Sequence, residues 1–226
     1  MALSGVRLVV FGKQGAGKGT QCVRLSDHYV VPHISTGDML RAAVKSGSAL
    51  GARVQSTMEA GELVSDDIIL EVMAARLAED DAAARGFVLD GFPRTVGQAD
   101  RLDDVLEPSV IDVVVSLEIP TSVVVGRIAQ RRTCSVCGRV YATSVPPKVD
   151  WTCDACGGEV VQREDDTEEA VTRRLALYDA QTAPLIARYA AAGRLVPVDA
   201  NGTVEEVAAR LLALVEARLG AGGVGA

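Results

Sequence analysis

A strand-like apolar run that leads directly into a glycine-rich turn is the feature that most restricts how this sequence can fold. The run is Arg7–Phe11, and the turn with its exit reads Gly12-Lys-Gln-Gly-Ala-Gly-Lys-Gly-Thr20. Short apolar runs bounded by turn residues predict a buried strand. Glycines let the backbone close around an anion, which inward-facing N–H groups and the start of the next helix stabilise. The segment therefore predicts a strand, a phosphate-binding loop and a helix in succession.

The loop departs in one place from the common phosphate-loop pattern, in which serine or threonine follows the lysine. Here Gly19 follows Lys18, and Thr20 comes next. Lys18 supplies a mobile charge for the outer phosphates, so the loop predicts a site for a nucleoside polyphosphate. A glycine-rich turn that only joins a strand to a helix is the alternative.

Strands alternate with helices along the rest of the chain. Further buried strands are predicted over 86–90, 110–117 and 195–199, with a short extended piece over 30–35. Helices are predicted over 17–29, from 35 to about 47, and over 50–60, 65–77, 96–106, 120–132, 166–189 (kinked at Pro184) and 204–219. Such alternation predicts an α/β fold with a parallel sheet flanked by helices, whose ligands bind at the carboxyl ends of the strands.

The overall charge and hydropathy exclude several classes of protein. The 226 residues carry a formal net charge of −7, which disfavours loose binding to nucleic acid or to acidic membranes. No apolar run has the length of a membrane span, and the first residues lack the layout of a signal peptide. We therefore expect a cytoplasmic protein with no nucleic-acid or membrane partner.

Four of the five cysteines form two Cys-x-x-Cys-Gly turns, at Cys134/Cys137 and Cys153/Cys156. This spacing predicts a structural zinc site with four thiolates and no open position. Disulfides, an iron–sulfur cluster and free thiols are the alternatives, and a reducing compartment weakens the first of them. Cys22 stands apart from these pairs, in the helix after the phosphate loop, and is predicted to be a small buried hydrophobe.

Several further motifs, taken together, resemble those of the adenylate kinase family over nearly the whole chain. They are Gly12–Thr20, Ser35-Thr-Gly-Asp-Met-Leu-Arg41, Asp90-Gly-Phe-Pro-Arg-Thr95 with Gln98, Gly126-Arg-x-x-x-Arg-Arg132, Arg163-x-Asp-Asp166 and Arg173-Arg-Leu175. The cysteine segment resembles the zinc-bearing long lid of many bacterial members. Gln14 stands where this family often has proline.

The resemblance implies a P-loop type core with two insertions. The core comprises 1–34, 65–130 and 169–219, the nucleoside monophosphate-binding domain 35–64, and the zinc-ribbon-like lid 131–168, followed by a flexible tail at 220–226. The implied reaction moves the terminal phosphoryl group of MgATP to AMP reversibly, giving two ADP, in a monomeric enzyme of adenine nucleotide homeostasis.

The resemblance also implies roles for individual residues. The ATP-binding set is Gly15, Ala16, Gly17, Lys18, Gly19, Thr20, Arg131, Val140 and Tyr141. The AMP-binding set is Thr36, Arg41, Glu62, Leu63, Val64, Gly91, Phe92, Pro93, Arg94, Gln98, Arg163 and Arg174. Catalytic charge is assigned to Lys18, Arg94, Arg131, Arg163 and Arg174. Asp90 would hold Mg²⁺ through water, since Mg²⁺ usually keeps several of its waters.

Some of these residues have alternative interpretations from the sequence itself. Thr36 suits a helix cap, Arg41 suits a solvated helix face, and Asp90 suits an ion pair with Arg94 or a cap of the next turn. Asp165 and Asp166 are predicted to latch the closed lid, with Asp166 as a helix cap in the alternative. Arg127 is a further candidate for ATP, and Arg173 is predicted to face solvent.

The two histidines, His28 and His33, are expected to be structural and to lie outside any charged or thiol cluster. Kinases for another nucleotide pair, GTP with AMP or ATP with UMP or CMP, remain an alternative. So does a nucleotide-sensing protein with a degraded site.

Overall fold

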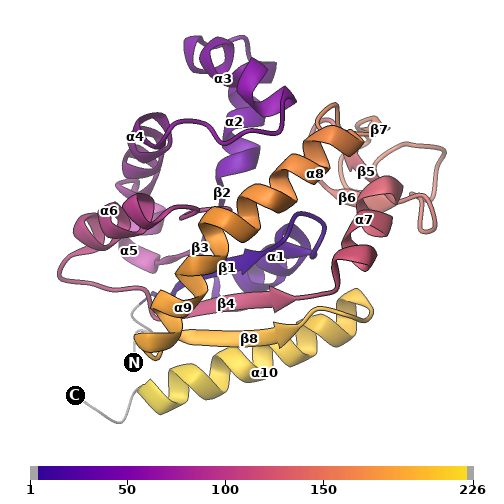
Figure 1. The fold of residues 1–226 in the computed structure, drawn as a ribbon. Coiled ribbons are helices and arrows are strands. Elements are labelled where there is room, and N and C mark those ends of the chain that lie inside the picture. The colour runs from indigo at the N-terminus through magenta and orange to yellow at the C-terminus, as the bar shows by residue number, and fades with distance from the viewer. Residues whose placement is uncertain (1–4, 223–226) are drawn as a thin grey trace.

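A five-stranded parallel sheet with the strand order β2-β3-β1-β4-β8 lies at the centre of the molecule (Figure 1). The computed structural model describes residues 5–222. The strands are β1 (Arg7–Gly12), β2 (His33–Ser35), β3 (Phe87–Asp90), β4 (Val113–Glu118) and β8 (Leu195–Asp199). The observed sheet confirms the predicted α/β class, and β8 has the predicted bounds.

Helices cover both faces of this sheet. The helices are α1 (Lys18–Tyr29), α2 (Thr36–Lys45), α3 (Ala49–Glu59), α4 (Asp66–Leu77), α5 (Asp80–Arg85), α6 (Val96–Leu106), α7 (Thr121–Gln130), α8 (Glu168–Leu177), α9 (Ala183–Ala191) and α10 (Val204–Gly222). In the described part of the chain, no helix combines the length and the apolarity that crossing a membrane requires.

Alternate residues of the central strand serve two separate cores. Val9 and Phe11 pack with α4, α6 and α9, whereas Leu8 and Val10 pack with α1 and α10. Figure 1 shows α9 crossing one face of the sheet and α10 lying along the other. Burial on both faces explains why these strands read as continuous apolar runs.

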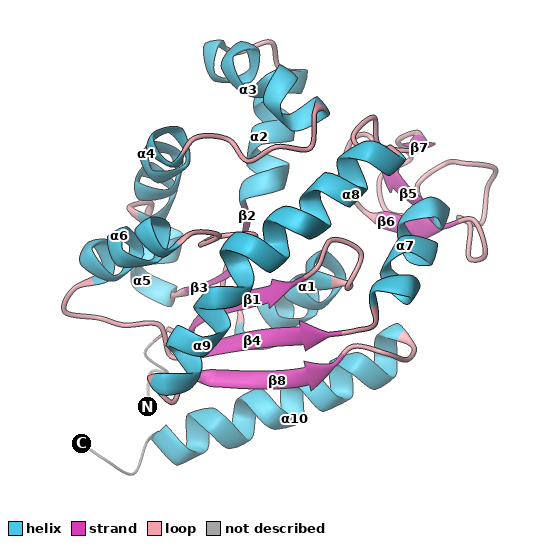
Figure 2. Cartoon of the chain, in the orientation of Figure 1, coloured by secondary structure: helices cyan, strands magenta, loops and turns pink. Residues whose placement is uncertain are grey.

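A second, small antiparallel sheet forms the cysteine insertion, which we define as residues 131–161. Its strands are β5 (Arg131–Cys134), β6 (Val140–Ala142) and β7 (Val160–Val161), with β5 in the middle. Figure 2 shows that loops make up most of this insertion. The predicted helix over 120–132 is therefore too long, because α7 ends at Gln130 and Arg131 takes an extended conformation.

Other departures from the predicted elements have local physical reasons. Helix α5 was not predicted, because its sequence Asp-Asp-Ala-Ala-Ala-Arg has no apolar periodicity. A π-helical turn over Tyr178–Thr182 joins α8 to α9. Pro184 lies in the first turn of α9, where its missing N–H is tolerated, so the irregularity precedes the proline.

Helix α10 continues to residue 222, three residues beyond its predicted end at 219. An established helix adds residues more readily than it starts, even through glycine. Residues 223–226 lie outside the described residues, as do residues 1–4 of the predicted core.

Candidate active site

The phosphate loop lies between β1 and α1, at the carboxyl edge of the sheet. Gly15 has φ +85°, and a Cβ there would lie 2.8 Å from Ile128 Cγ1, so no larger residue fits. Lys18 Nζ donates hydrogen bonds to the carbonyl oxygens of Gly12 at 2.7 Å and Lys13 at 3.1 Å. Burial lowers the pKa of Lys18. Gly15–Thr20 thus form one continuous cradle with its lysine turned inward.

Asp90 ends β3, next to β1, and its carboxylate is almost fully buried. Burial alone would raise its pKa, but the nearby His33 ring and the charge of Lys18 outweigh burial and lower it. A Cβ on Gly19 would lie 3.5 Å from Asp90 Oδ2, so the carboxylate faces the end of the phosphate loop. An anionic oxygen beside a polyphosphate cradle suits the water shell of Mg²⁺.

The expectation that His33 stands apart from charged and thiol groups is wrong. His33 Nε2 lies 3.6 Å from Asp90 Oδ2, and the Cys22 thiol completes a cluster with them. The parallel pairing of β2 with β3 sets this arrangement, since Ser35 is the register partner of Asp90. His28 instead pairs with Glu216 on α10.

The loop after β3 brings Arg94 and Gln98 to the same edge. Arg94 Nε donates to the Gly91 carbonyl at 2.7 Å, and Gln98 Oε1 accepts from the Arg94 backbone N–H at 2.8 Å. Gln98 Nε2 donates to Asp66 Oδ1 at 2.6 Å, so both ends of this buried amide are engaged. Phe92 is buried in the core, and Pro93 follows it.

The helical insertion formed by α2 and α3 reaches over this loop. Thr36 is buried, and its hydroxyl donates to the Gly91 carbonyl at 3.0 Å, while Ser35 acts as the cap of α2. Arg41 NH2 pairs with Asp38, and its NH1 lies 3.9 Å from Asp165. The segment after α3 follows, with Glu62 exposed, Leu63 partly buried and Val64 buried.

The hinge of the cysteine insertion holds three arginines and two buried aspartates. Arg131 binds Asp166 with two nitrogens, the Nε contact being 2.8 Å. Arg174 NH2 lies 2.7 Å from Asp165 Oδ2 and donates to the Met58 carbonyl at 3.0 Å. Arg163 Nε donates to the Thr133 hydroxyl at 3.1 Å. Asp166 is therefore no helix cap, and Thr167 caps α8 by accepting from the Ala170 N–H.

These groups form one cluster with more positive than negative charges, called the cation cluster below. Six cations lie close enough there to affect one another's charge: Lys18, Arg41, Arg94, Arg131, Arg163 and Arg174. They face four carboxylates, those of Asp38, Asp90, Asp165 and Asp166. Burial, with the charges of Arg41 and Arg131, lowers the pKa of Arg163 to about 10. The arrangement thus leaves an excess of positive charge that bound phosphate groups would neutralise.

The cysteine insertion brings its four sulfurs together. The Sγ atoms of Cys134, Cys137, Cys153 and Cys156 all lie within 4.8 Å of one another, with Cys134 and Cys156 3.5 Å apart. Four thiolates around zinc stand about 3.8 Å apart, from Zn–S bonds of about 2.3 Å. The residues therefore fit a tetrahedral zinc ion. Their sulfurs are free rather than disulfide-bonded.

Val140 is exposed, and Tyr141 turns toward the sulfurs. The Tyr141 hydroxyl donates to Cys153 Sγ at 3.4 Å and accepts from the Asp154 N–H at 2.8 Å. The hydrogen bond from Tyr141, together with those from the backbone N–H groups of Ala155 and Cys156, lowers the pKa of the Cys153 thiol to about 6. Tyr141 thus supports the thiolate cluster.

Two further arginines bind backbone oxygens. Arg127 donates to the Ala200 and Gly202 carbonyls at 3.2 and 3.3 Å. Arg173 is exposed, as predicted, and binds Ala60 O and Glu62, both at 3.0 Å.

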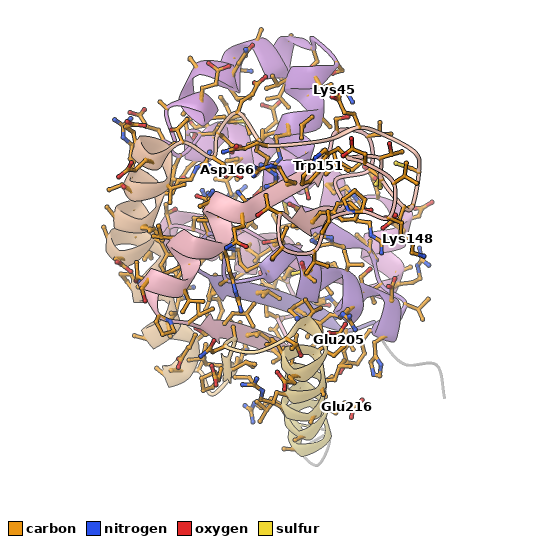
Figure 3. All side chains as sticks on the ribbon, turned by 90° about the vertical axis from the view of Figure 1, so that its right-hand side faces the viewer. Lys45, Lys148, Trp151, Asp166, Glu205 and Glu216 are labelled. Carbon is orange, nitrogen blue, oxygen red and sulfur yellow. The ribbon has the colours of Figure 1, made fainter. Side chains whose placement is uncertain are left out.

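Four contacts in this region were missed by sequence reasoning because they join distant segments. Gln14 Nε2 donates a hydrogen bond to Asp166 at 3.1 Å. The Asp66 carboxylate accepts hydrogen bonds from the Gln98 amide and from the Thr95 hydroxyl. Lys45 Nζ donates to the Ser135 carbonyl at 2.6 Å, which links the helical insertion to the cysteine insertion. Figure 3 shows Lys45 beside the loops that carry Trp151 and Lys148. Only the unusual Gln14 carried a signal in the sequence.

Comparison with known proteins gives a consistent set of relatives. A family model described as adenylate kinase matches residues 10–194. Adenylate kinase of Citrifermentans bemidjiense is 49% identical over 215 residues, which cover 94% of this chain and 100% of that protein. Adenylate kinase of Trichlorobacter lovleyi is 50% identical over 215 residues, with 93% and 100% covered. Adenylate kinase of Archaeoglobus fulgidus is 45% identical over 214 residues, with 93% and 98% covered.

Proposed function

This chain belongs to the adenylate kinase family, and we propose that the cation cluster described above carries out the family's reaction with the residues assigned below. The protein is an enzyme that transfers the terminal phosphoryl group of MgATP reversibly to AMP, giving two ADP. Its role is to balance the adenine nucleotide pool.

The donor side is assigned to the phosphate loop and the hinge. Backbone N–H groups of Gly15–Thr20 hold the ATP phosphates, and Lys18 moves from its carbonyl partners to the outer phosphates. Arg131 releases the Asp166 carboxylate and binds a phosphate oxygen of ATP. Val140 and Tyr141 border the ATP nucleoside. Asp90 holds the water shell of the Mg²⁺ ion that arrives with ATP.

The acceptor side is assigned to the helical insertion and the loop after β3. Arg41 and Arg94 bind the AMP phosphate as forked donors, and Thr36 and Gln98 border the adenine. Backbone groups of Glu62, Leu63 and Val64 and the turn Gly91-Phe92-Pro93 line the nucleoside. Arg163 and Arg174 bind the AMP phosphate and the phosphoryl group in transfer.

Alignment and charge neutralisation account for the chemistry. The AMP phosphate oxygen attacks the terminal phosphorus of ATP in line, and the bond to the ADP oxygen breaks. Lys18, Arg94, Arg131, Arg163 and Arg174 offset the negative charge of the moving group. Closure of both insertions excludes water, which would otherwise hydrolyse ATP.

A zinc ion in the cysteine insertion has a structural role in this proposal. Cys134, Cys137, Cys153 and Cys156 would hold it, and it would cross-link a small sheet that has little apolar core of its own. The four free thiols suit a reducing compartment, which supports a cytoplasmic location.

The domain division follows from these roles. We assign 1–34, 65–130 and 169–219 to the core, 35–64 to AMP binding and 131–168 to the lid, in a monomer.

The convergence of the six cations on one strand edge is the observation that carries the proposal. A coupled assay with AMP, GMP, CMP and UMP as acceptors and ATP and GTP as donors tests it. We expect ATP with AMP to give the highest kcat/KM by at least about 100-fold over the other acceptors, because the acceptor site hydrogen-bonds its base. Preference for another acceptor, or no transfer at all, would overturn the proposal.

A further inference from the structure

A second cluster of metal-ligating side chains lies behind the phosphate loop. The Cys22 sulfur, a His33 ring nitrogen and an Asp90 carboxylate oxygen all lie within 4.8 Å of one another. Among residues 5–222, only this cluster and the four cysteines bring at least three Cys, His, Asp or Glu ligand atoms within 4.8 Å of one another. The three residues come from α1, the start of β2 and the end of β3.

The sheet dictates this meeting. Strands β2 and β3 pair in parallel, with His33 opposite Val88 and Ser35 opposite Asp90. Residues two apart on a strand share a face, so His33 and Asp90 lie on the same side of the sheet. Val88 packs in the same core as Cys22, which places that side under α1.

The cluster has an unsatisfied polar atom at its centre. His33 Nε2 is buried and makes no hydrogen bond, and its nearest acidic oxygen, on Asp90, is 3.6 Å away. The Cys22 residue is fully buried and free. A buried polar atom without a partner is costly, and a bound cation would remove that cost.

We propose that Cys22, His33 and Asp90 form a second metal site, selective for Zn²⁺ and similar thiophilic divalent ions. Thiolate and imidazole ligands favour Zn²⁺ over Mg²⁺ and Ca²⁺, which take oxygen ligands. The Cys22 thiol releases its proton to solvent as the metal binds. Three protein ligands leave the fourth position to water, so the ion is exchangeable, unlike one held by four cysteines.

Occupation of this site inhibits the enzyme, a consequence that rests on the proposed function. A metal-bound Asp90 no longer accepts from the water shell of Mg²⁺. It also no longer balances the nearby charge of Lys18. The same ion family thus stabilises the protein at the four cysteines and inhibits it at this cluster.

Cobalt titration of the full chain with zinc already bound to the four cysteines tests the site directly. We expect one equivalent of Co²⁺ to bind the wild type, with a visible thiolate-to-cobalt absorption band. Cys22→Ala and His33→Gln should lose the band and bind at least about tenfold more weakly, because each removes one ligand. His28→Gln is the matched control, since His28 lies apart from the cluster and should leave the band unchanged.

Inhibition by Zn²⁺ at saturating MgATP and AMP gives the second readout. Cys22→Ala should require at least about tenfold more Zn²⁺ for half-inhibition. Thermal unfolding of both variants shows whether they fold. If Cys22→Ala does not fold, the result for His33→Gln decides the test. No cobalt band in the wild type, or an unchanged band in both folded variants, would overturn the site. Cobalt binding without inhibition would confirm the site and overturn the assignment of Asp90 to Mg²⁺.

Discussion

The Lys18 side chain can be separated experimentally from the loop that surrounds it. Its Nζ is buried against two loop carbonyls, whereas the neighbouring Lys13 points outward to Thr121 and Asp179. Lys18→Met should lower kcat by about 10³-fold, since one preorganised charge is lost from the transition state. The far-UV circular dichroism spectrum should not change. Lys13→Met is the matched control, and near-normal turnover by Lys18→Met would contradict the assignment.

Val30 adopts a backbone conformation that its side chain disfavours. It follows α1 with φ 56° and is 68% exposed, so the strain has no compensating burial. A β-branched residue in the left-handed region costs about 1–2 kcal/mol. Val30→Gly should therefore raise the free energy of unfolding by about 1 kcal/mol in urea titrations.

A valine-to-glycine substitution inside α1 should change the free energy of unfolding in the opposite direction. Val23 lies inside the helix and is 48% exposed. Val23→Gly should lower the free energy of unfolding by about 0.5–1 kcal/mol, because glycine weakens a helix interior. Equal effects of the two substitutions would rule out backbone strain at Val30.

At the scale of elements, the hinge before α8 should make stability depend on pH. Burial would raise the pKa of Asp165, but Arg174 and Arg41 outweigh burial and lower it below the ordinary 3.8. Because this pKa is lower in the folded than in the unfolded state, the ionised carboxylate stabilises the protein fully above pH 3.8. This stabilisation is lost as the pH falls through the folded-state pKa. Asp165→Asn should therefore cost about 2 kcal/mol at pH 7 and less at pH 3.

Urea unfolding at the two pH values measures this difference. Asp104→Asn is the control, because Asp104 forms an exposed pair with Arg101 and should change stability by less than about 0.5 kcal/mol. A cost of Asp165→Asn that stays constant with pH would contradict the role of its charge.

The cysteine insertion should depend on its metal. Its buried apolar cluster is limited to Cys134, Cys153 and Val160, with Tyr141 packed against it. Removing zinc with a chelator should lower the melting temperature and expose the insertion to limited proteolysis within 135–160. The core should keep its helical circular dichroism signal. A metal-free protein with unchanged melting and cleavage would mean that no structural ion is bound.

At the scale of the whole molecule, short-range patterns predicted elements well and long-range contacts poorly. Helix Val96–Leu106 and strand Leu195–Asp199 have the predicted bounds, because apolar periodicity and flanking turns mark their ends. The meeting of Lys18, Asp90 and Arg94 followed from the rule that parallel strands end at one edge. Their roles in catalysis stay predictions. The Gln14–Asp166 contact spans 152 residues, and no local pattern encodes it.

The excess positive charge of the cation cluster predicts a conflict between stability and activity. The lowered pKa of Arg163, about 10, means that the folded protein disfavours its charged form until phosphates bind. Arg163→Met should therefore raise the free energy of unfolding of the ligand-free protein by about 1 kcal/mol, a shift of about 2–4 °C, while lowering kcat at least about 100-fold.

A bisubstrate dinucleotide separates this charge effect from simple repacking. The dinucleotide should raise the melting temperature of the wild type more than that of Arg163→Met, because the variant lacks one of the cations that bind the dinucleotide phosphates. Arg101→Met, at an exposed arginine on α6, is the control and should leave both melting temperatures unchanged. If Arg163→Met melts below the wild type without ligand, and its melting temperature rises as much with the dinucleotide, then repulsion among the arginines does not destabilise this cation cluster.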